Sequence, residues 1–320
     1  MLAVVIGLAA TMRYLVRHGA RLEGPTTQVE SDGGWPRTLV ERDPDGGVIR
    51  RQVLSVPPKR IVSVSLATDE ILVNLVERER IAALSTFAPK PGSLIRDRVQ
   101  GIPKFVDADV ETIIALEPDL CFLASYNRAE TRSILIDSGV PVFVFHRFDS
   151  LDDIRTNIRT VGQAVGAEGK ADQLISQMDQ KIRRVNEKLP PLGERPTALA
   201  YSTSGWVAGK GTLQAELFEA AGLRSAAAEF GINGFAKVSA ERILMMDPDY
   251  LVIATGPSDT EHQKEWLSAN PALASLRAIR QNRYLAIEEP LLSTVSHRMA
   301  DSVVQLARQA YPDRFTGEDE

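Results

Sequence analysis

Cysteine and histidine are scarce in this chain of 320 residues. Cys121 is the only cysteine, so the chain can form no internal disulfide bond and no site with several cysteine ligands. It lies within an apolar segment, which predicts a buried and unreactive thiol. The histidines are His18, His146, His262 and His297. Because none has HxH or HExxH spacing, we expect no resident metal ion, although His146 and His297 could meet a carboxylate such as Glu288 in a cleft.

The chain also lacks the sequence marks of nucleic-acid binding, nucleotide binding and catalysis. Its formal net charge is −5 at pH 7 and it has no basic stripe, which argues against a nucleic-acid partner. Residues 205–212 resemble a phosphate loop, but Lys210 precedes a glycine instead of a serine or threonine. No GxGxxG motif follows an apolar strand, and no serine or cysteine lies in a nucleophile elbow. We therefore expect no cofactor and no enzymatic activity.

The apolar run at residues 1–12 is too short to predict a membrane-spanning helix. It resembles the apolar part of an export signal without the basic residues that normally precede it. We expect residues 1–30 to comprise an export signal or an N-terminal anchor, followed by a loose polar segment. Residues 31–58 should then form a lead-in hairpin around a turn at residues 43–47.

Beyond this lead-in, apolar strands alternate with helices. The expected strands cover residues 61–64, 81–84, 120–123 and 142–145, and then 197–201, 251–253 and 284–287. Residues 65–68 are expected to form a loop in which Thr68 caps the next helix. This alternation predicts parallel sheets, and 44% hydrophobic with 25% charged residues is typical of a soluble protein of about two domains. We predict an α/β protein with two Rossmann-like lobes, at residues 59–166 and 191–320.

One long amphipathic helix is predicted between the lobes. Its apolar positions repeat every three or four residues and are Ala171, Leu174, Ile175, Met178, Ile182 and Val185. No glycine or proline lies within residues 170–189, and Pro190 and Pro191 end the helix. About 20 residues at about 1.5 Å each make a rod of about 30 Å. We therefore predict one rigid interlobe helix at residues 167–190.

An internal repeat supports the two similar lobes. The matched pairs are Ile102 and Ile232, Phe105 and Phe235, Glu111 and Glu241, and Ile113 and Ile243, each with the same offset (232 − 102 = 130). Each copy predicts a helix that begins after Asp109 or Ser239, then a Pro-Asp turn and a strand. So long a period indicates duplicated domains. Packing explains the isoleucines, but Glu111 and Glu241 lie in first helical turns, where we expect them to be exposed.

Aromatic residues make up only 6% of the chain, and several fall at strand ends or in the loops after strands. These are Phe87, Phe105, Tyr126, Phe148, Trp206 and Phe235. Ligands of open parallel sheets bind outside the carboxyl ends of the strands. Two such edges facing each other would form an aromatic-lined cleft, although each ring could instead cover the core of its own lobe.

Four segments, in the same order along the chain, carry a family resemblance. They are PKRIVSVSLATDEIL at residues 58–72, VETIIALEPDL at 110–120, GVPVF at 139–143, and the glycine-containing segment 211–222. They resemble the substrate-binding proteins of ABC importers for iron–siderophore complexes, haem and cobalamin. The resemblance covers residues 37–312 and implies two α/β lobes joined by one long helix, the class III arrangement, whose lobes close little. It also implies a periplasmic location, a metal-chelate ligand and a membrane permease dimer as partner.

The resemblance assigns roles to single residues. Glu111 and Glu241 match the surface glutamates that dock on permease arginines in cobalamin-binding relatives. Phe105, Phe235 and Trp206 match cleft aromatics, although the relatives carry tryptophan at the first two positions. The expected ligand-binding residues are Ser65, Thr68, Phe87, Phe105, Tyr126, His146, Trp206, Phe235, Leu291, His297 and Arg298.

These observations predict a periplasmic substrate-binding protein that captures a bulky metal chelate between its lobes and delivers it to an ABC permease. Ferric siderophore is the first expected ligand, and cobalamin or another corrinoid is the next. Arg147, Arg298 and Trp206 suit an anionic siderophore, whereas a haem ligand would need Tyr126, His146 or His297 at its iron. A bare-metal or haem binding protein, a sensor of the same fold and a two-lobe enzyme remain the alternatives.

Overall fold

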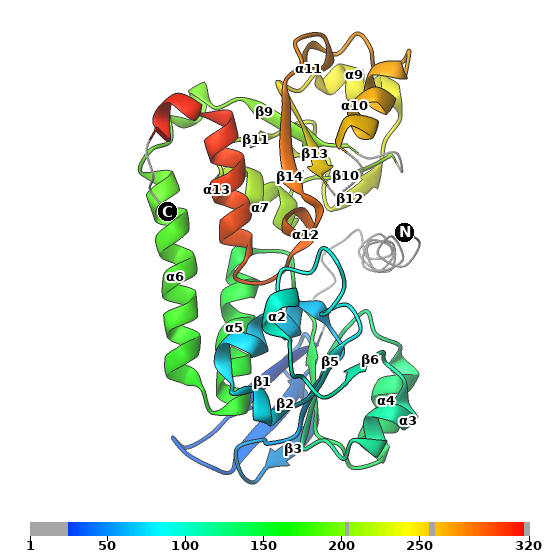
Figure 1. Cartoon of the computed structure of the whole chain (residues 1–320), viewed down its shortest axis with the longest axis vertical. Coiled ribbons are helices and arrows are strands. Elements are labelled where there is room, and N and C mark those ends of the chain that lie inside the picture. Colours follow the sequence, from blue (N-terminus) through cyan, green and yellow to red (C-terminus); the bar gives the residue numbers. More distant parts are fainter. Residues whose placement is uncertain (1–24, 202–204, 256–259, 317–320) are drawn as a thin grey trace.

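The computed structural model describes residues 25–201, 205–255 and 260–316, and it shows two α/β lobes joined by one long helix (Figure 1). The predicted fold class is therefore confirmed. Most of the expected export signal or anchor, including His18, lies outside the described residues. Within the described ranges, no helix is both long and apolar enough to cross a membrane.

A three-stranded antiparallel sheet precedes the first lobe. Its strands are β1 Thr26–Glu30, β2 Arg37–Arg42 and β3 Val48–Leu54, in the order β1-β2-β3. The expected hairpin forms, because the Asp43 amide donates to the Gly47 carbonyl at 2.8 Å and the Asp43 carboxylate accepts from the Gly47 amide at 2.7 Å. The expectation of a loose segment up to residue 30 was wrong, since β1 pairs with β2 along its whole length.

The first lobe contains a five-stranded parallel sheet in the order β6-β5-β4-β7-β8. The strands are β4 Ile61–Ser63, β5 Ile81–Ser85, β6 Phe105–Val106, β7 Leu120–Ala124 and β8 Val142–Phe145. Its helices are α2 Leu66–Leu75, α3 Val110–Ala115, α4 Ala129–Asp137 and α5 Leu151–Val165, with short 3-10 helices Arg78–Arg80 and Arg96–Arg98. The Gln52 side chain of β3 donates to the Val140 carbonyl and accepts from the Val142 amide, both at 3.1 Å, and so joins the N-terminal sheet to β8.

The second lobe contains a four-stranded parallel sheet in the order β11-β9-β13-β14. The strands are β9 Thr197–Ala200, β11 Arg224–Ser225, β13 Tyr250–Thr255 and β14 Tyr284–Glu288. Its helices are α7 Leu213–Ala220, α8 Ala226–Glu229, α9 Ala240–Met246, α10 Thr260–Ala269, α11 Arg277–Arg280, α12 Glu289–Ser293 and α13 Met299–Ala310, with 3-10 helices Leu192–Glu194 and Pro312–Arg314.

The glycine-rich segment at residues 205–212 contributes one strand to a two-stranded antiparallel ribbon. It consists of β10 Trp206–Ala208 and β12 Phe235–Lys237. Next to it, the Gly209 amide donates to the Gly234 carbonyl at 2.8 Å. A Cβ atom on Gly209 would lie 2.1 Å from the Ile232 carbonyl oxygen. Close approach of two backbone segments therefore explains a glycine in this phosphate-loop-like sequence.

The two copies of the repeat adopt the same local structure. The strand order β5-β4-β7-β8 of the first lobe corresponds to β11-β9-β13-β14 of the second. Helices α3 and α9 begin as predicted after Asp109 and Ser239, whose side chains accept hydrogen bonds from the Thr112 and Arg242 amides. These bonds satisfy amides at helix ends that have no partner within the helix.

The Pro-Asp turns of the repeat also have the same role in both lobes. Asp119 accepts a hydrogen bond of 2.6 Å from the Lys59 amide, just before β4. Asp249 accepts one of 2.8 Å from the Thr197 amide, at the start of β9. Asp119, just before β7, is therefore bonded to the start of β4, and Asp249, just before β13, is bonded in the same way to the start of β9.

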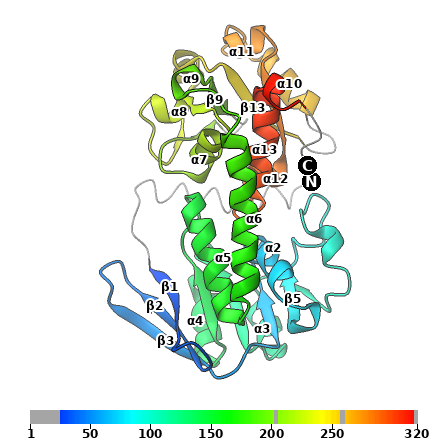
Figure 2. The same cartoon turned by 90° about the vertical axis from the view of Figure 1, so that its left-hand side faces the viewer.

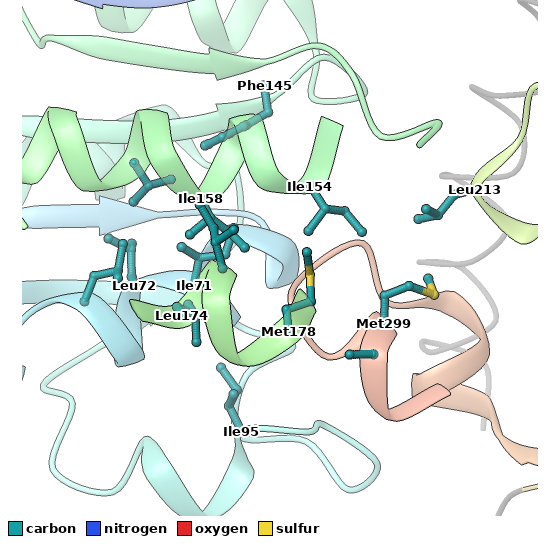
Figure 3. Close-up of a cluster of buried hydrophobic side chains, with 14 of the residues drawn as sticks. Ile71, Leu72, Ile95, Phe145, Ile154, Ile158, Leu174, Met178, Leu213 and Met299 are labelled. Carbon is teal, nitrogen blue, oxygen red and sulfur yellow. The ribbon is translucent and has the colours of Figure 1, made fainter. Parts of the chain in front are cut away.

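Helix α6 Glu168–Asn186 is the predicted interlobe helix, and all six of its predicted apolar positions are buried. It packs against α5 and α2 of the first lobe and against α13 and α7 of the second (Figure 2). A single cluster of buried side chains runs from Ile71 and Leu174 through Met178 to Leu213 and Met299 (Figure 3). The two lobes therefore share one continuous hydrophobic core along α6.

Candidate functional site at the lobe junction

The carboxyl ends of both parallel sheets lie toward the junction of the two lobes. Strand β4 leads into α2 and strand β14 leads into α12, and both helices lie at this junction (Figure 1). In sheets of this kind, the loops that follow the strands form the ligand site. Most of the predicted ligand-binding residues follow strand ends of this type.

A hydroxyl pair lies at the carboxyl edge of the first lobe. The Ser65 Oγ atom, at the N-cap of α2, is 2.7 Å from the Tyr126 hydroxyl, which follows β7. The Tyr126 ring centroid is 6.1 Å from that of Phe148, which follows β8. Burial raises the pKa of Tyr126 to about 12, so the phenol is neutral. The structure thus brings together three residues that the sequence placed at separate strand ends.

A small hollow lies between this edge and the second lobe, and we call it the junction hollow. It is too narrow to hold a water molecule, and it is lined by Ala67, Thr68, Ile71, Phe145, Phe148, Asn157 and Val295. Val295 comes from the second lobe, and the other lining residues come from the first. The Thr68 side chain is only 1% exposed, and its Oγ1 atom has no hydrogen-bond partner among the described residues. Thr68 lies within α2, so the expectation that it caps this helix from a preceding loop was wrong.

Asp69 is a buried acid beside the hollow that the sequence analysis did not assign to the site. Its Oδ2 atom accepts hydrogen bonds from the Ser85 amide at 3.1 Å and the Ser85 hydroxyl at 2.5 Å. Burial raises the pKa of Asp69 to about 7, and hydrogen bonds from Ser63 and Ser85 oppose this effect. The Oδ1 atom has no partner in the described part of the chain.

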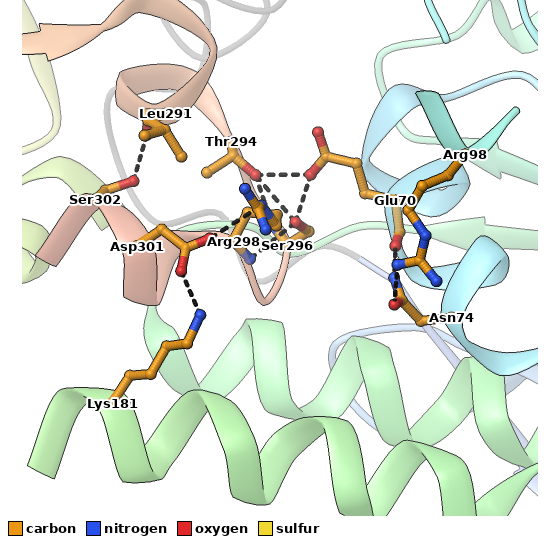
Figure 4. Close-up of polar contacts among 10 residues, drawn as sticks. All are labelled: Glu70, Asn74, Arg98, Lys181, Leu291, Thr294, Ser296, Arg298, Asp301 and Ser302. Atoms are coloured by element: carbon orange, nitrogen blue, oxygen red, sulfur yellow. Dashed lines mark hydrogen bonds and ion pairs between the residues drawn. The ribbon is translucent and has the colours of Figure 1, made fainter. Parts of the chain in front are cut away.

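Glu70 connects the two lobes directly. Its Oε2 atom accepts a hydrogen bond of 2.8 Å from the Thr294 hydroxyl and a second bond from the Ser296 hydroxyl (Figure 4). Burial raises the pKa of Glu70, and the two hydroxyl bonds oppose this effect. Glu70 lies on α2 of the first lobe, whereas its partners lie between α12 and α13 of the second. No sequence motif pointed to this contact.

Arg298 was expected to hold an anionic ligand, but the structure pairs it within the protein. Its Nε atom is 3.0 Å from the Asp301 carboxylate, which also lies 2.5 Å from the Lys181 ammonium group of α6 (Figure 4). Next to it, burial and the charge of Arg298 lower the pKa of His297 to about 4, so this imidazole is neutral at pH 7. The His297 Nδ1 atom is buried and has no partner among the described residues.

His146 lies against the N-terminal sheet. Its side chain is 7% exposed and its Nε2 atom is 3.6 Å from the Glu41 carboxylate of β2. Glu41 also pairs with Arg50 at 2.8 Å and with Arg132 at 3.6 Å. Since His146 faces Glu41 of the N-terminal sheet, we do not include it in the proposed site. Within the described ranges, no group of three or more His, Cys, Asp or Glu side chains could hold a metal ion.

The predicted aromatic residues are neither fully buried nor fully exposed. Trp206 and Phe235 lie on the two strands of the ribbon, and both are half-buried without joining a core cluster of the described residues. Phe105 is also half-buried but packs against the shared core. The Lys90 ammonium group lies 4.5 Å from the centroid of the Phe87 ring. Leu291 is only 8% exposed and belongs to the shared core.

Glu111 and Glu241 are exposed in the first turns of α3 and α9, as predicted. These helices lie toward opposite ends of the molecule, on the side away from α6 (Figure 1). The two carboxylates are therefore held apart by a body whose lobes share one core.

Comparison with known proteins identifies the family. A family model described as periplasmic binding protein matches residues 61–291, from the start of β4 into α12. The chain belongs to the periplasmic binding protein family. This family membership confirms the resemblance to the substrate-binding proteins of ABC importers.

Cys121, as predicted, is a buried thiol of this protein, and burial raises its pKa to about 12.

Three proteins are examples of what this periplasmic binding protein is similar to. The ABC transporter substrate-binding lipoprotein YvrC of Bacillus subtilis is 26% identical over 81% of this chain and 82% of its own length. A cobalamin-binding protein of Halobacterium salinarum is 25% identical over 80% of this chain and 68% of its own length. The solved structure of the periplasmic heme-binding protein RhuT from Roseiflexus sp. RS-1 superimposes with a TM-score of 0.68 at 25% identity, over 80% of this chain and 99% of that chain.

Proposed function

We propose that this periplasmic binding protein captures a bulky metal chelate at the lobe junction and delivers it to the permease of an ABC importer. The observation that carries the proposal is the lobe junction, where the carboxyl ends of both parallel sheets meet and where the Ser65–Tyr126 hydroxyl pair and the Phe148 ring lie together at one sheet edge. The names of the cobalamin-binding and heme-binding relatives support the ligand class.

Within this class, the proposal favours a macrocyclic chelate. The sequence analysis placed ferric siderophore first, partly because Arg298 suits an anionic ligand. Arg298 is paired with Asp301, whereas Phe148, Trp206 and Phe235 offer rings near the junction that can pack on the apolar face of a corrinoid or haem. We therefore place corrinoid and haem before ferric siderophore.

The proposed site comprises Ser65, Thr68, Tyr126, Phe148, Trp206 and Phe235. Haem would in addition need an axial ligand, and the neutral imidazole of His297 is a candidate, because its Nδ1 atom has no partner among the described residues. We further propose that residues 1–24 direct or anchor the protein outside the cytoplasm, and that the lobes extend over residues 59–166 and 191–320.

Absorption spectroscopy tests the proposed ligand class. The protein is mixed separately with cyanocobalamin, haemin and a ferric hydroxamate siderophore, desalted and scanned. We expect one chromophore to co-elute with the protein. In the Trp206→Ala and Phe235→Ala variants, less of it should be retained. The Trp266→Phe variant is the matched control, because Trp266 packs against Tyr201 in the core of the second lobe.

Protein that stays colourless with all three compounds would overturn the chelate proposal. Elemental analysis of the purified protein would then examine the bare-ion alternative. If neither aromatic substitution changes the amount of chromophore that co-elutes, the ligand class would stand. The assignment of Trp206 and Phe235 to the ligand site would then be rejected.

A further inference from the structure

We propose that Glu70 and Glu216 are positioning residues, which hold the two lobes at a fixed angle and thereby set the shape of the ligand site. Each glutamate reaches from its own lobe to the other. The inference rests on the proposed function only in taking the lobe junction as the ligand site. The arrangement of the lobes can be measured without any ligand.

The bonds of Glu70 fix a short segment of the second lobe over the first. Both hydroxyl donors of Glu70, on Thr294 and Ser296, are buried, and the Glu70 side chain is itself only 2% exposed. Between the two donors lies Val295, which lines the junction hollow together with Thr68. Because Glu70 holds the residues on both sides of Val295, it determines where this wall of the hollow lies.

Glu216 makes the reciprocal contact from the second lobe to the first. Its Oε2 atom on α7 accepts a hydrogen bond of 2.7 Å from the Leu151 amide, the first residue of α5. The first amides of a helix have no partner within the helix, and the positive end of the helix dipole attracts a carboxylate. Helix α5 also supplies Asn157 to the junction hollow. The two glutamates therefore act on α2 and α5, the two helices of the first lobe that line this hollow.

The shared hydrophobic core alone does not provide this positional control. Apolar contacts along α6 favour burial but have no preferred direction, whereas a hydrogen bond weakens steeply when its angle changes. Each lobe has buried side chains of its own beyond the shared core. Loss of the interlobe bonds should therefore change the angle between the lobes and leave each lobe folded.

Distance measurement between spin labels on the two lobes tests this inference. Labels are attached through Ala115→Cys on α3 and Met245→Cys on α9, which are exposed and equivalent in the repeat. The native thiol of Cys121 is fully buried and should not react. Pulsed electron paramagnetic resonance then gives the distribution of interlobe distances in the full chain without ligand. We expect a narrow distribution for the otherwise unchanged protein.

The Glu70→Ala and Glu216→Ala variants should shift this distribution and broaden it. Glu70→Gln should restore the narrow distribution, because its amide oxygen still accepts from both hydroxyls. Ser302→Ala is the matched control, since the buried Ser302 hydroxyl bonds to Leu291 within the second lobe. If only about a tenth of the Glu70→Ala molecules keep the native angle between the lobes, their apparent ligand affinity should fall about tenfold.

A Glu70→Ala distribution identical to that of the unchanged protein would overturn the inference. If Glu70→Ala does not fold, Thr294→Val provides the same test, because it removes one hydroxyl donor and keeps the volume of the side chain. A broadened distribution for Ser302→Ala would show that any buried defect loosens the lobes, and this result would also reject the assignment. Since no chelate is present, failure here leaves the ligand proposal untouched.

Discussion

Ionisation of Asp69 should make the stability of the protein depend on pH. Its pKa is raised from 3.8 to about 7 in the folded state, so the folded protein retains a proton that the unfolded chain has released. The stabilisation is complete below about pH 4 and is lost as pH rises through about 7. Asp69→Asn should remove this dependence, because its amide oxygen can still accept from Ser85. Urea unfolding of both proteins between pH 4 and 8 measures the difference.

The natural control for this titration is Asp109, whose carboxylate is exposed at the N-cap of α3. Hydrogen bonding to Thr112 lowers the pKa of Asp109, so its ionised form is the one that stabilises the fold. Its contribution should therefore be lost as pH falls, which is the opposite direction. Parallel pH profiles for the wild-type protein and the Asp69→Asn variant would contradict the role given to Asp69.

Gly209 should tolerate no side chain. A Cβ atom there would collide with the Ile232 backbone, which cannot move aside as a flexible side chain could. We expect Gly209→Ala to lower the free energy of unfolding by about 1–3 kcal/mol, the usual cost of overpacking. Gly193→Ala is the control, since nothing lies within 4 Å of its Cβ position. Chemical denaturation measures both, and equal effects would contradict the close-approach explanation.

At the scale of elements, α6 should be the most sensitive helix to truncation of its buried face. Met178 lies in the middle of the helix and packs in the cluster shared by both lobes (Figure 3). Met178→Ala should cost about 2–5 kcal/mol, whereas Gln177→Ala on the exposed face should cost little. Thermal unfolding should stay a single transition in both variants. Two separate transitions would show that the lobes do not share one cooperative core.

The elements that could be predicted from sequence are those whose own residues determine them. The helix at α6 follows from six apolar side chains at helical spacing, and the buried strands follow from short apolar runs. Strand β1 and the ribbon of β10 and β12 could not be found in this way. Their residues become strands only because a partner strand pairs with them. Strands β10 and β12 are distant from each other in the chain, and a polar segment separates β1 from its partner β2.

The site was predictable only in part, for a related reason. Motif position correctly brought Ser65, Tyr126 and Phe148 to one sheet edge, because carboxyl ends of parallel strands lie together. It could not reveal that Asp301 pairs with Arg298. Nor could it reveal Glu70, whose hydroxyl partner Thr294 is 224 residues away in the chain. Contacts between the lobes leave no periodic signal in the sequence.

At the scale of the whole molecule, capture of ligand and delivery to the membrane should be separable. Glu111 and Glu241 are exposed, and their helices α3 and α9 lie toward opposite ends of the molecule, whereas α2 and α12 lie at the junction (Figure 1). The double variant Glu111→Ala with Glu241→Ala should bind the proposed chelate with unchanged affinity and support no uptake, because the proposed charge-assisted bonds to permease arginines could not form. Glu130→Ala, at an exposed carboxylate of α4, is the control. Normal uptake by the double variant would reject the docking assignment.

The repeated strand order of the two lobes has a consequence for the geometry of docking. Because equivalent glutamates stand on equivalent helices, with an offset of 130 residues (241 − 111), each lobe presents its glutamate in the same local structure. If the two glutamates dock on the two halves of a permease dimer, as we expect, both halves meet the same element of the binding protein. Exchanging Glu111 and Glu241 then yields a second acceptable pose. In either pose, the lobe junction, where we propose the ligand site, lies between the two docking helices α3 and α9 (Figure 1).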